Sequence, residues 1–454
     1  MTSRLAELQI DGLFNLYSYK IQLRRSQRIT ILIGPNGRGK TVCLKFVEAL
    51  YQKNHRYFAS IPFQNARFLF DDRKEILVER IQSAESQTDG NDSEYSVRLT
   101  LIRPGQDDVS WIPSSIERGL IQEVRKHIPS QWADVSFDLW VDRTDGEELS
   151  LRELGERYPI PKKILSSTEE HCPDEINTLL EGVDCHLIET QRLLVLPTST
   201  SDWQDERRVF FQNRRRSRAS RLAIQQKAEN LKKILKDTIS QYANLSQSLD
   251  RSFPLRVFEQ SLSTPQDEKL REKLKNLDSR REDLVRAGIL DASSDSVTLK
   301  GGDIDPGVAK ALEIYVEDTV KKLDVFNDIQ SKLDLLKELI EERFIDKTFQ
   351  ISRENGFNFI SKSGSDIPLE KLSSGEQHQF ILIFDLLFEV KKDSFILIDE
   401  PELSLHIAWQ KSFIESLAKI INLNAFDVLM ATHSPALVSH HWELAVELSA
   451  TNEE

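Results

Sequence analysis

The sequence Ile29-Thr-Ile-Leu-Ile-Gly-Pro-Asn-Gly-Arg-Gly-Lys-Thr41 decides the fold that we expect for this chain. Its first five residues are apolar or β-branched, which predicts a buried strand. Gly34 is followed by four residues and then by Gly39, Lys40 and Thr41, which is the P-loop spacing. Because a strand runs directly into the loop, as this motif requires, we expect a helix to begin near Lys40.

The residue types in this loop suit the binding of phosphate groups. Glycines allow the backbone to curl, so that successive N–H groups point at phosphate oxygens. The ammonium of Lys40 would lie between the outer phosphates of a nucleotide, and the Thr41 hydroxyl is a magnesium ligand. The residues that we expect to contact the nucleotide are Gly34, Pro35, Asn36, Gly37, Arg38, Gly39, Lys40 and Thr41. The simpler interpretation is a glycine-rich turn in front of an ordinary helix.

Composition and charge narrow the class of protein. The chain has 454 residues and a net charge of −13, which argues against general coating of nucleic acid but allows a local basic patch. No apolar run approaches the ~20 residues of a membrane span, and the N-terminus lacks the apolar core of a signal peptide. Cys43, Cys172 and Cys185 have no metal-ligand spacing and suit a reducing compartment. We therefore expect a cytoplasmic protein with no membrane partner.

Short alternating segments surround the P-loop and predict strands. Ala6–Ile10 and Tyr17–Leu23 are expected to form a hairpin around a turn at Asp11-Gly12. A helix should follow from Thr41 to Gln52. An antiparallel β region is predicted from the strands Ala66–Phe70, Glu75–Ile81 and Tyr95–Ile102, with a polar loop over 82–94 and further strands at Ser136–Val141 and 186–194.

The middle of the chain changes character from about residue 204 and becomes helical. Residues 207–221 contain seven arginines and no acid. Apolar residues then recur every three or four positions over 222–249 and again over 312–340, on either side of a charged helical stretch at 265–286. These patterns predict an antiparallel helical arm. We expect three segments: 1–203 and 346–454 as the two halves of one domain, with 204–345 as the helical insertion.

A second group of functional residues follows the predicted strands Phe349–Ser352 and Phe357–Ser361. Leu372-Ser-Ser-Gly-Glu-Gln377 precedes a predicted helix, 379–390, and a buried strand, 395–398, which ends in Asp399 and Glu400. Asp399 is placed to hold magnesium, and Glu400 can polarise a water for in-line attack on a γ-phosphate.

A last buried strand, Asp427–Ala431, follows a predicted helix that ends near Ile421, and it leads into Thr432 and His433. The carboxyl ends of parallel strands meet at one edge of a sheet, where ligands bind. We therefore expect His433 to lie beside the P-loop, close to Glu400, with ATP and Mg²⁺ as cofactors. A surface histidine with satisfied hydrogen bonds is the simpler interpretation of His433.

At this point the chain resembles a known family. Gly34–Thr41 resembles a Walker A motif, Leu372–Gln377 an ABC signature, Phe395–Glu400 a Walker B motif and His433 an H-switch. The last resemblance implies that His433 is a catalytic residue together with Glu400. Their order and the helical insertion are similar to the SMC and RecF branch of ABC-type ATPases, which includes the overcoming-lysogenisation-defect proteins. The resemblance implies an α/β fold: an ABC-type P-loop ATPase head, with a mixed sheet and an antiparallel β subdomain, and an inserted antiparallel helical arm.

The resemblance also implies a composite site, in which the signature of one subunit closes the nucleotide site of another. The signature residues are Ser373, Ser374, Gly375 and Glu376; Ser374 stands where glycine is usual and Glu376 where glutamine is common. The resemblance makes Gln191, at the end of a predicted strand, the candidate Q-loop ligand of magnesium. A polar residue that caps a strand is the alternative.

In size and motif content the chain resembles the ATPase subunits of PARIS-type and Septu-type anti-phage systems. That resemblance implies a homo-oligomer of at least two heads, or a hexamer, and a separately encoded effector such as a nuclease. A RecF-like ATPase of DNA repair and an ATP-bound structural scaffold are the alternatives. The cluster Arg207–Arg221 would contact DNA or an acidic protein trigger, or form a solvated face.

Overall fold

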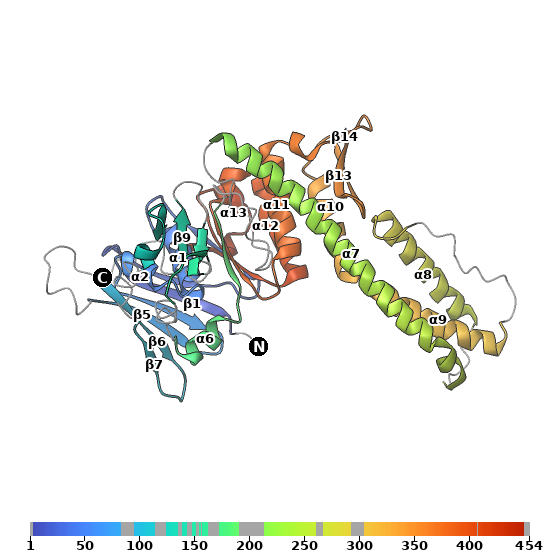
Figure 1. The fold of residues 1–454 in the computed structure, drawn as a ribbon, viewed down its shortest axis with the longest axis horizontal. Coiled ribbons are helices and arrows are strands. Elements are labelled where there is room, and N and C mark those ends of the chain that lie inside the picture. The colour runs from blue at the N-terminus through green and yellow to red at the C-terminus, as the bar shows by residue number, and fades with distance from the viewer. Residues whose placement is uncertain are drawn as a thin grey trace. The chain divides into compact units, whose positions relative to one another are not determined.

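The computed structural model describes residues 3–82, 95–113, 124–134, 139–142, 148–150, 154–155, 157–161, 172–189, 213–259, 267–291, 304–405 and 407–448 (Figure 1). The chain divides into two compact units. We call Met1–Ala219 with Glu389–Glu454 the head unit, and Ser220–Phe388 the inserted unit. The inserted unit therefore extends beyond residue 345, the end of the predicted insertion, because the segment that follows packs with its helices.

A five-stranded parallel sheet forms the centre of the head unit. Its strand order is β11 (Cys185–Glu189), β15 (Phe395–Asp399), β16 (Asp427–Ala431), β3 (Ile29–Ile33) and β17 (Ala445–Glu447). Each neighbouring pair runs parallel. Each of the middle strands contains four consecutive buried residues, nearly all of them apolar, as expected for a sheet covered on both faces. This topology brings the ends of β3, β15 and β16 to one edge.

An antiparallel sheet of six strands forms the second layer of the head unit. In order across the sheet, these are β2 (Tyr17–Gln22), β1 (Leu5–Leu13), β4 (Asn65–Phe70), β5 (Glu75–Gln82), β6 (Tyr95–Ile102) and β7 (Val109–Trp111). A separate small sheet contains β8 (Trp132–Asp134), β9 (Leu139–Asp142) and β10 (Glu148–Ser150). The predicted antiparallel region and the mixed α/β fold class are confirmed.

The predicted turn at Asp11-Gly12 is wrong. Strand β1 continues to Leu13, and its pairing register with β2 shifts between Ile10 and Leu13. Gly12 has a φ of 67° at this bulge, whereas the actual turn places Phe14 and Asn15 at φ values of 54° and 59°. The glycine therefore marks a bulge rather than the reversal of the chain.

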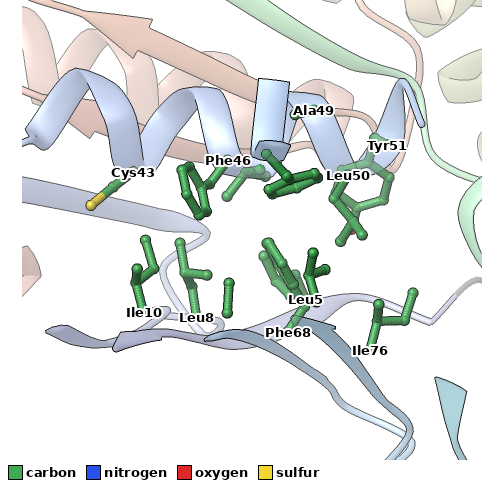
Figure 2. Close-up of a cluster of buried hydrophobic side chains, with 14 of the residues drawn as sticks. Leu5, Leu8, Ile10, Cys43, Phe46, Ala49, Leu50, Tyr51, Phe68 and Ile76 are labelled. Atoms are coloured by element: carbon green, nitrogen blue, oxygen red, sulfur yellow. The ribbon is translucent and has the colours of Figure 1, made fainter. Parts of the chain in front are cut away.

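Helix α1 (Lys40–Tyr51) lies between the two sheets and anchors the P-loop. Its buried side chains, including Phe46 and Leu50, point toward Leu8 and Phe68 of the antiparallel sheet (Figure 2). Burying each such side chain contributes about 1.5–3 kcal/mol. Among the described residues, the head unit also contains α2 (His55–Ser60), α6 (Asp174–Leu180), α12 (Ile407–Asn424) and α13 (Pro435–Val438). The packing of the buried side chains of α1 fixes the position of this helix, and therefore of the P-loop at its start.

The inserted unit is mostly helical. Its helices are α7 (Asn213–Glu259, whose first residues precede the unit), α8 (Asp267–Arg286), α9 (Pro306–Asp324), α10 (Asn327–Glu341) and α11 (Ser374–Phe384), with a small sheet of β12 (Lys347–Ser352), β13 (Gly356–Ser361) and β14 (Asp366–Ile367). A π-helix, Asp385–Glu389, continues α11. Lys227 of α7 forms a buried ion pair with Asp385 at 2.8 Å.

Two helix predictions needed correction. The apolar stripe over 312–340 belongs to two helices, because α9 ends at Asp324 and α10 begins at Asn327. Phe326, which lies in the break, is fully buried and so continues the stripe without continuing the helix. The helix predicted over 379–390 starts earlier, at Ser374, where Ser373 caps it.

Candidate functional site

The P-loop has the backbone that its glycines predict. Gly37 and Gly39 have φ values of 77° and 81°, in the left-handed region, and Gly39 is the N-cap of α1. A side chain at Gly39 would also come within 2.9 Å of Leu13. The loop thus requires glycine for its curvature and delivers Lys40 and Thr41 as the first two residues of the helix.

The β1–β2 hairpin braces this loop, a contact that the sequence did not reveal. The Tyr19 hydroxyl donates to the carbonyl oxygen of Arg38 at 2.7 Å. The Arg38 guanidinium lies 5.0 Å from the centre of the Tyr17 ring, within the range of a cation–π contact. Burial raises the pKa of Tyr19 to about 12, so its hydroxyl keeps the proton that it donates. The hydrogen bond from Tyr19 therefore fixes the Arg38 carbonyl of the P-loop against the β1–β2 hairpin.

Lys40 is almost fully enclosed by the site, with 5% of its surface exposed. Its Nζ donates to the carbonyl oxygens of Gly34 at 2.7 Å and Pro35 at 3.0 Å. Burial lowers the pKa of Lys40, while the carboxylates of Glu400, Asp399 and Glu402 act in the opposite direction. The ammonium is thus held by neutral carbonyls, with which the more strongly attracting oxygens of a phosphate would compete.

Thr41 and Asp399 bring two oxygen ligands together. The Thr41 hydroxyl donates to the Asp399 carboxylate, with Oγ1 at 2.9 Å from Oδ2 and 3.1 Å from Oδ1. Magnesium is usually held by one or two protein oxygens together with phosphates and water. No cluster of three or more potential metal ligands among His, Cys, Asp and Glu occurs in the described part of the chain. This pair therefore fits Mg²⁺ that enters with a nucleotide.

His433 connects the P-loop lysine to Glu400. Its Nδ1 lies 3.1 Å from Nζ of Lys40, and its Nε2 lies 3.3 Å from Oε1 of Glu400. Because an ammonium can only donate, Nδ1 is the acceptor when Lys40 donates to this ring, and Nε2–H is then the donor toward Glu400. Glu400 itself has a left-handed φ of 48°, and its N–H donates to the carbonyl of Ala431 at 2.9 Å. Strands β15 and β16 thus place both predicted catalytic residues beside the P-loop.

A further acid, Glu402, was missed by the sequence analysis. Its carboxylate accepts from the Thr432 hydroxyl at 2.8 Å and from the backbone N–H of His433 at 2.7 Å. Gln410 of α12 reaches the same loop, where its Oε1 accepts from the Ser434 hydroxyl at 2.8 Å. The only signal in the sequence was a second acid two residues after Glu400.

The signature residues lie in the inserted unit, at the start of α11. Ser373 and Glu376 form a capping box: the Ser373 Oγ accepts from the Glu376 N–H at 3.3 Å, and the Glu376 carboxylate accepts from the Ser373 N–H at 2.8 Å. Lys347 forms an ion pair with Glu376. Ser374 and Gly375 form the first turn of the helix, and a Cβ at Gly375 would meet nothing within 4 Å.

Several predicted features lie wholly or partly outside the described residues. These are Gln191, residues 207–212 of the arginine cluster, residues 83–94 of the polar loop, and parts of the strands predicted at Ser136–Val141 and 186–194. Residues 213–221 belong to the backbone of α7, but the positions of their side chains are not described. Within the described residues, no helix is long and apolar enough to cross a membrane.

The strand–loop–helix with Lys40, Thr41 and Asp399 at the sheet edge defines a P-loop nucleotide-binding protein. The comparison with protein families agrees: the chain matches the model of the AAA ATPase domain over residues 7–438, and it belongs to that family. Membership implies nucleotide binding, typically with a divalent metal. No curated protein matches the sequence.

Several solved structures are similar to this chain. The Smc head domain of Pyrococcus furiosus, with an extended coiled coil and bound to the C-terminal domain of ScpA, is 12% identical, with a TM-score of 0.30 and coverage of 99% of this chain and 94% of that chain. The SMC head domain of Thermotoga maritima is 11% identical, with a TM-score of 0.31 and coverage of 97% and 92%.

Proposed function

We propose that this chain hydrolyses ATP to ADP and phosphate at the edge of the parallel sheet. The observation that carries the proposal is a pair of contact sets, Thr41–Asp399 and Lys40–His433–Glu400. They join the P-loop to residues at the ends of β15 and β16. A phosphate-binding loop by itself would support only the conclusion that the protein binds a nucleotide. A carboxylate beside that loop, held by a histidine, adds a group that can act on water.

Each residue has a role that follows from its position. Lys40 exchanges its carbonyl acceptors for phosphate oxygens, and Thr41 and Asp399 hold Mg²⁺. When bound, Mg²⁺ neutralises charge on the phosphates. Glu400 orients the attacking water and accepts a hydrogen bond from it, while the Nε2–H of His433 keeps the carboxylate aimed at the nucleotide. The same imidazole contacts Lys40, so a movement of Lys40 when the phosphates change would shift the His433 ring and, through it, the position of Glu400.

We further propose that the site is completed between subunits. Ser373, Ser374, Gly375 and Glu376 of one copy would close over the nucleotide bound at Lys40 of another, as the signature resemblance implies. The capping box supports this role because it fixes Ser373 at the N-terminus of α11, and helix N-termini favour phosphate. The assembly would be a homo-oligomer with at least two heads, or a hexamer.

The cellular role that we propose is regulation of a separate effector. The resemblance to ATPase subunits of PARIS-type and Septu-type systems supports a cytoplasmic sensor in prokaryotic antiviral defence, with a nuclease as its partner. An acidic protein or DNA would act as the trigger at Arg207–Arg221. The protein expressed alone should then hydrolyse ATP without cleaving DNA or RNA, and should co-purify with the product of a neighbouring gene.

Two alternative roles give different results in the same experiments. A RecF-like repair ATPase would bind duplex DNA with an affinity that falls steeply as salt increases, and replacing Arg214, Arg215 and Arg216 would weaken it. A structural scaffold would bind ATP and show almost no turnover. Nuclease activity of the isolated, pure chain would contradict the partner hypothesis.

The binding step is tested by Lys40→Ala. The variant loses the ammonium that meets the phosphates, so we expect no measurable ATP binding in calorimetric titration with Mg²⁺. Lys45→Ala, a change of a second lysine on the same helix α1, is the control and should bind as wild type does. Wild-type affinity of the folded Lys40→Ala protein would refute the P-loop assignment.

The chemical step is tested by Glu400→Gln. The amide preserves the size of the side chain but is a much poorer hydrogen-bond acceptor for water, so ATP should bind while the turnover rate falls by roughly 100-fold or more. Steady-state phosphate release and single-turnover kinetics measure this. Glu443→Gln, which changes an acid outside the site, is the matched control. A turnover rate equal to that of wild type would show that Glu400 is not the group that acts on water.

A further inference from the structure

The turn that follows β15 carries two acids with different contacts. Pro401 begins the 3-10 helix Pro401–Ser404 immediately after Glu400, and proline at this position restricts the backbone. The Leu403 N–H donates back to the Glu400 carbonyl at 3.1 Å. Glu400 and Glu402 are therefore presented by one short, constrained turn, and a change in its position moves both carboxylates together.

The second acid holds the backbone on which His433 is carried. Both oxygens of Glu402 are used: Oε1 accepts from the His433 N–H at 2.7 Å and Oε2 from the Thr432 hydroxyl at 2.8 Å. Thr432 is fully buried, and its Oγ1 also accepts from the Ser434 N–H at 2.9 Å. One carboxylate thus fixes three consecutive residues of the loop after β16, directly or through Thr432.

The two acids therefore hold His433 at two points. Glu402 fixes its backbone, while Glu400 lies 3.3 Å from the Nε2 of its ring. The remaining ring nitrogen lies 3.1 Å from Lys40. A histidine that must contact two charged groups at once has little freedom to shift, because movement toward one lengthens the contact with the other.

We infer that Glu402 is a positioning residue for ATP hydrolysis, which sets the placement of His433 between Lys40 and Glu400. This inference rests on the proposed function for its kinetic consequence, but the contact itself exists without nucleotide. Glu402 touches no reacting atom. Its loss should leave the phosphate-binding loop intact and disturb only the step in which Glu400 must be held in place.

The contact is tested first in the nucleotide-free protein. The chain has nine histidines, so ¹⁵N-histidine labelling gives a simple amide spectrum, in which His433→Gln identifies the signal of His433. We expect this amide to exchange slowly with solvent in wild type, and at least tenfold faster in Glu402→Gln, because the change replaces one of the two acceptor oxygens by an NH₂ group, which can only donate. Glu443→Gln is the matched control, since Glu443 Oε1 lies 3.5 Å from Nδ1 of His441 and its loss should leave the His433 signal unchanged.

The kinetic consequence is tested by a double-mutant cycle. Glu402→Gln should lower kcat by roughly 10- to 100-fold, as loss of a supporting hydrogen bond does around other catalytic groups, with the dissociation constant for ATP nearly unchanged. In the presence of His433→Ala, the same change should lower kcat by less than about twofold, because the group that Glu402 positions is already absent.

The outcomes separate the two proposals. Fast exchange of the wild-type His433 amide, or a signal unaffected by Glu402→Gln, overturns the positioning role even if the variant folds poorly, because the first measurement needs no variant. The positioning role is also overturned if Glu402→Gln has the kcat of wild type. It is equally overturned if Glu402→Gln lowers kcat by the same factor in the His433→Ala protein as in wild type. Absence of ATP turnover in wild type would instead refute the proposed function and leave the amide measurement to decide the contact.

Discussion

The substitution Lys227→Met should strongly destabilise the inserted unit. Lys227 and Asp385 pair at 2.8 Å with side chains that are only 4% and 0% exposed. Methionine keeps the length of the side chain but leaves the Asp385 charge without this cation in a buried position. Removing one member of such a pair costs about 3–5 kcal/mol. For a unit of about 170 residues, each kcal/mol lowers Tm by ~2–4 °C, so we expect a decrease of roughly 6–20 °C.

The measurement is calorimetric unfolding of the full chain, in which the transition of the inserted unit should move. Lys232→Met on the same helix is the matched control, since its pair with Glu229 is 44% and 72% exposed and should cost less than ~0.5 kcal/mol. Lys227→Met combined with Asp385→Leu should recover most of the loss, because both charges of the buried pair are then removed. The reasoning fails if Lys227→Met costs no more than the control, or if the double variant is as unstable as the single one.

Two other predictions concern the signature and the small sheet. Ser373→Arg should block turnover without preventing ATP binding, and mixing it with Lys40→Ala subunits should restore part of the activity; normal turnover in Ser373→Arg would exclude closure by the signature. Gly356→Ala should destabilise the protein by several kcal/mol in urea titration, because its Cβ would lie 2.0 Å from the Ala228 carbonyl oxygen. Gly364→Ala has the same type of left-handed φ and open space around it, so its cost should be limited to about 1–2 kcal/mol; equal losses would contradict the steric argument.

Much of the head unit could be predicted because its strands are short and strongly patterned. The predicted strands Tyr95–Ile102 and Asp427–Ala431 coincide with β6 and β16. The break between α9 and α10 could not be predicted from apolar spacing, since buried Phe326 occupies the position that a continuous helix would also bury. Periodicity reports which residues are buried, and it does not report whether the backbone between them stays helical.

The candidate site shows the same division. The motifs predicted Lys40, Asp399 and His433 as members of the site, because each follows a buried strand at a recognisable spacing, and the structure places them at one sheet edge. Tyr19 and Glu402 were not identified, since their importance depends on contacts with the Arg38 carbonyl and the His433 N–H, which belong to other segments of the chain. The partners of Tyr19 and Glu402 are backbone groups, and nearly every residue carries the same backbone groups. The sequence therefore gives no signal for which N–H or carbonyl a side chain will contact.

The pairing of β3 has a consequence for synthesis of the protein on the ribosome. Both strands that flank β3 in the parallel sheet, β16 and β17, come from the C-terminal part of the chain. Ile31 pairs with Met430, so about 400 residues must be added after the P-loop strand emerges, which takes ~20–80 s at typical rates of translation. During that interval the P-loop strand lacks both neighbours, and Lys40 lacks His433. A nascent chain that has not yet reached β16 and β17 therefore cannot assemble this nucleotide site, which forms only after both strands have been synthesised.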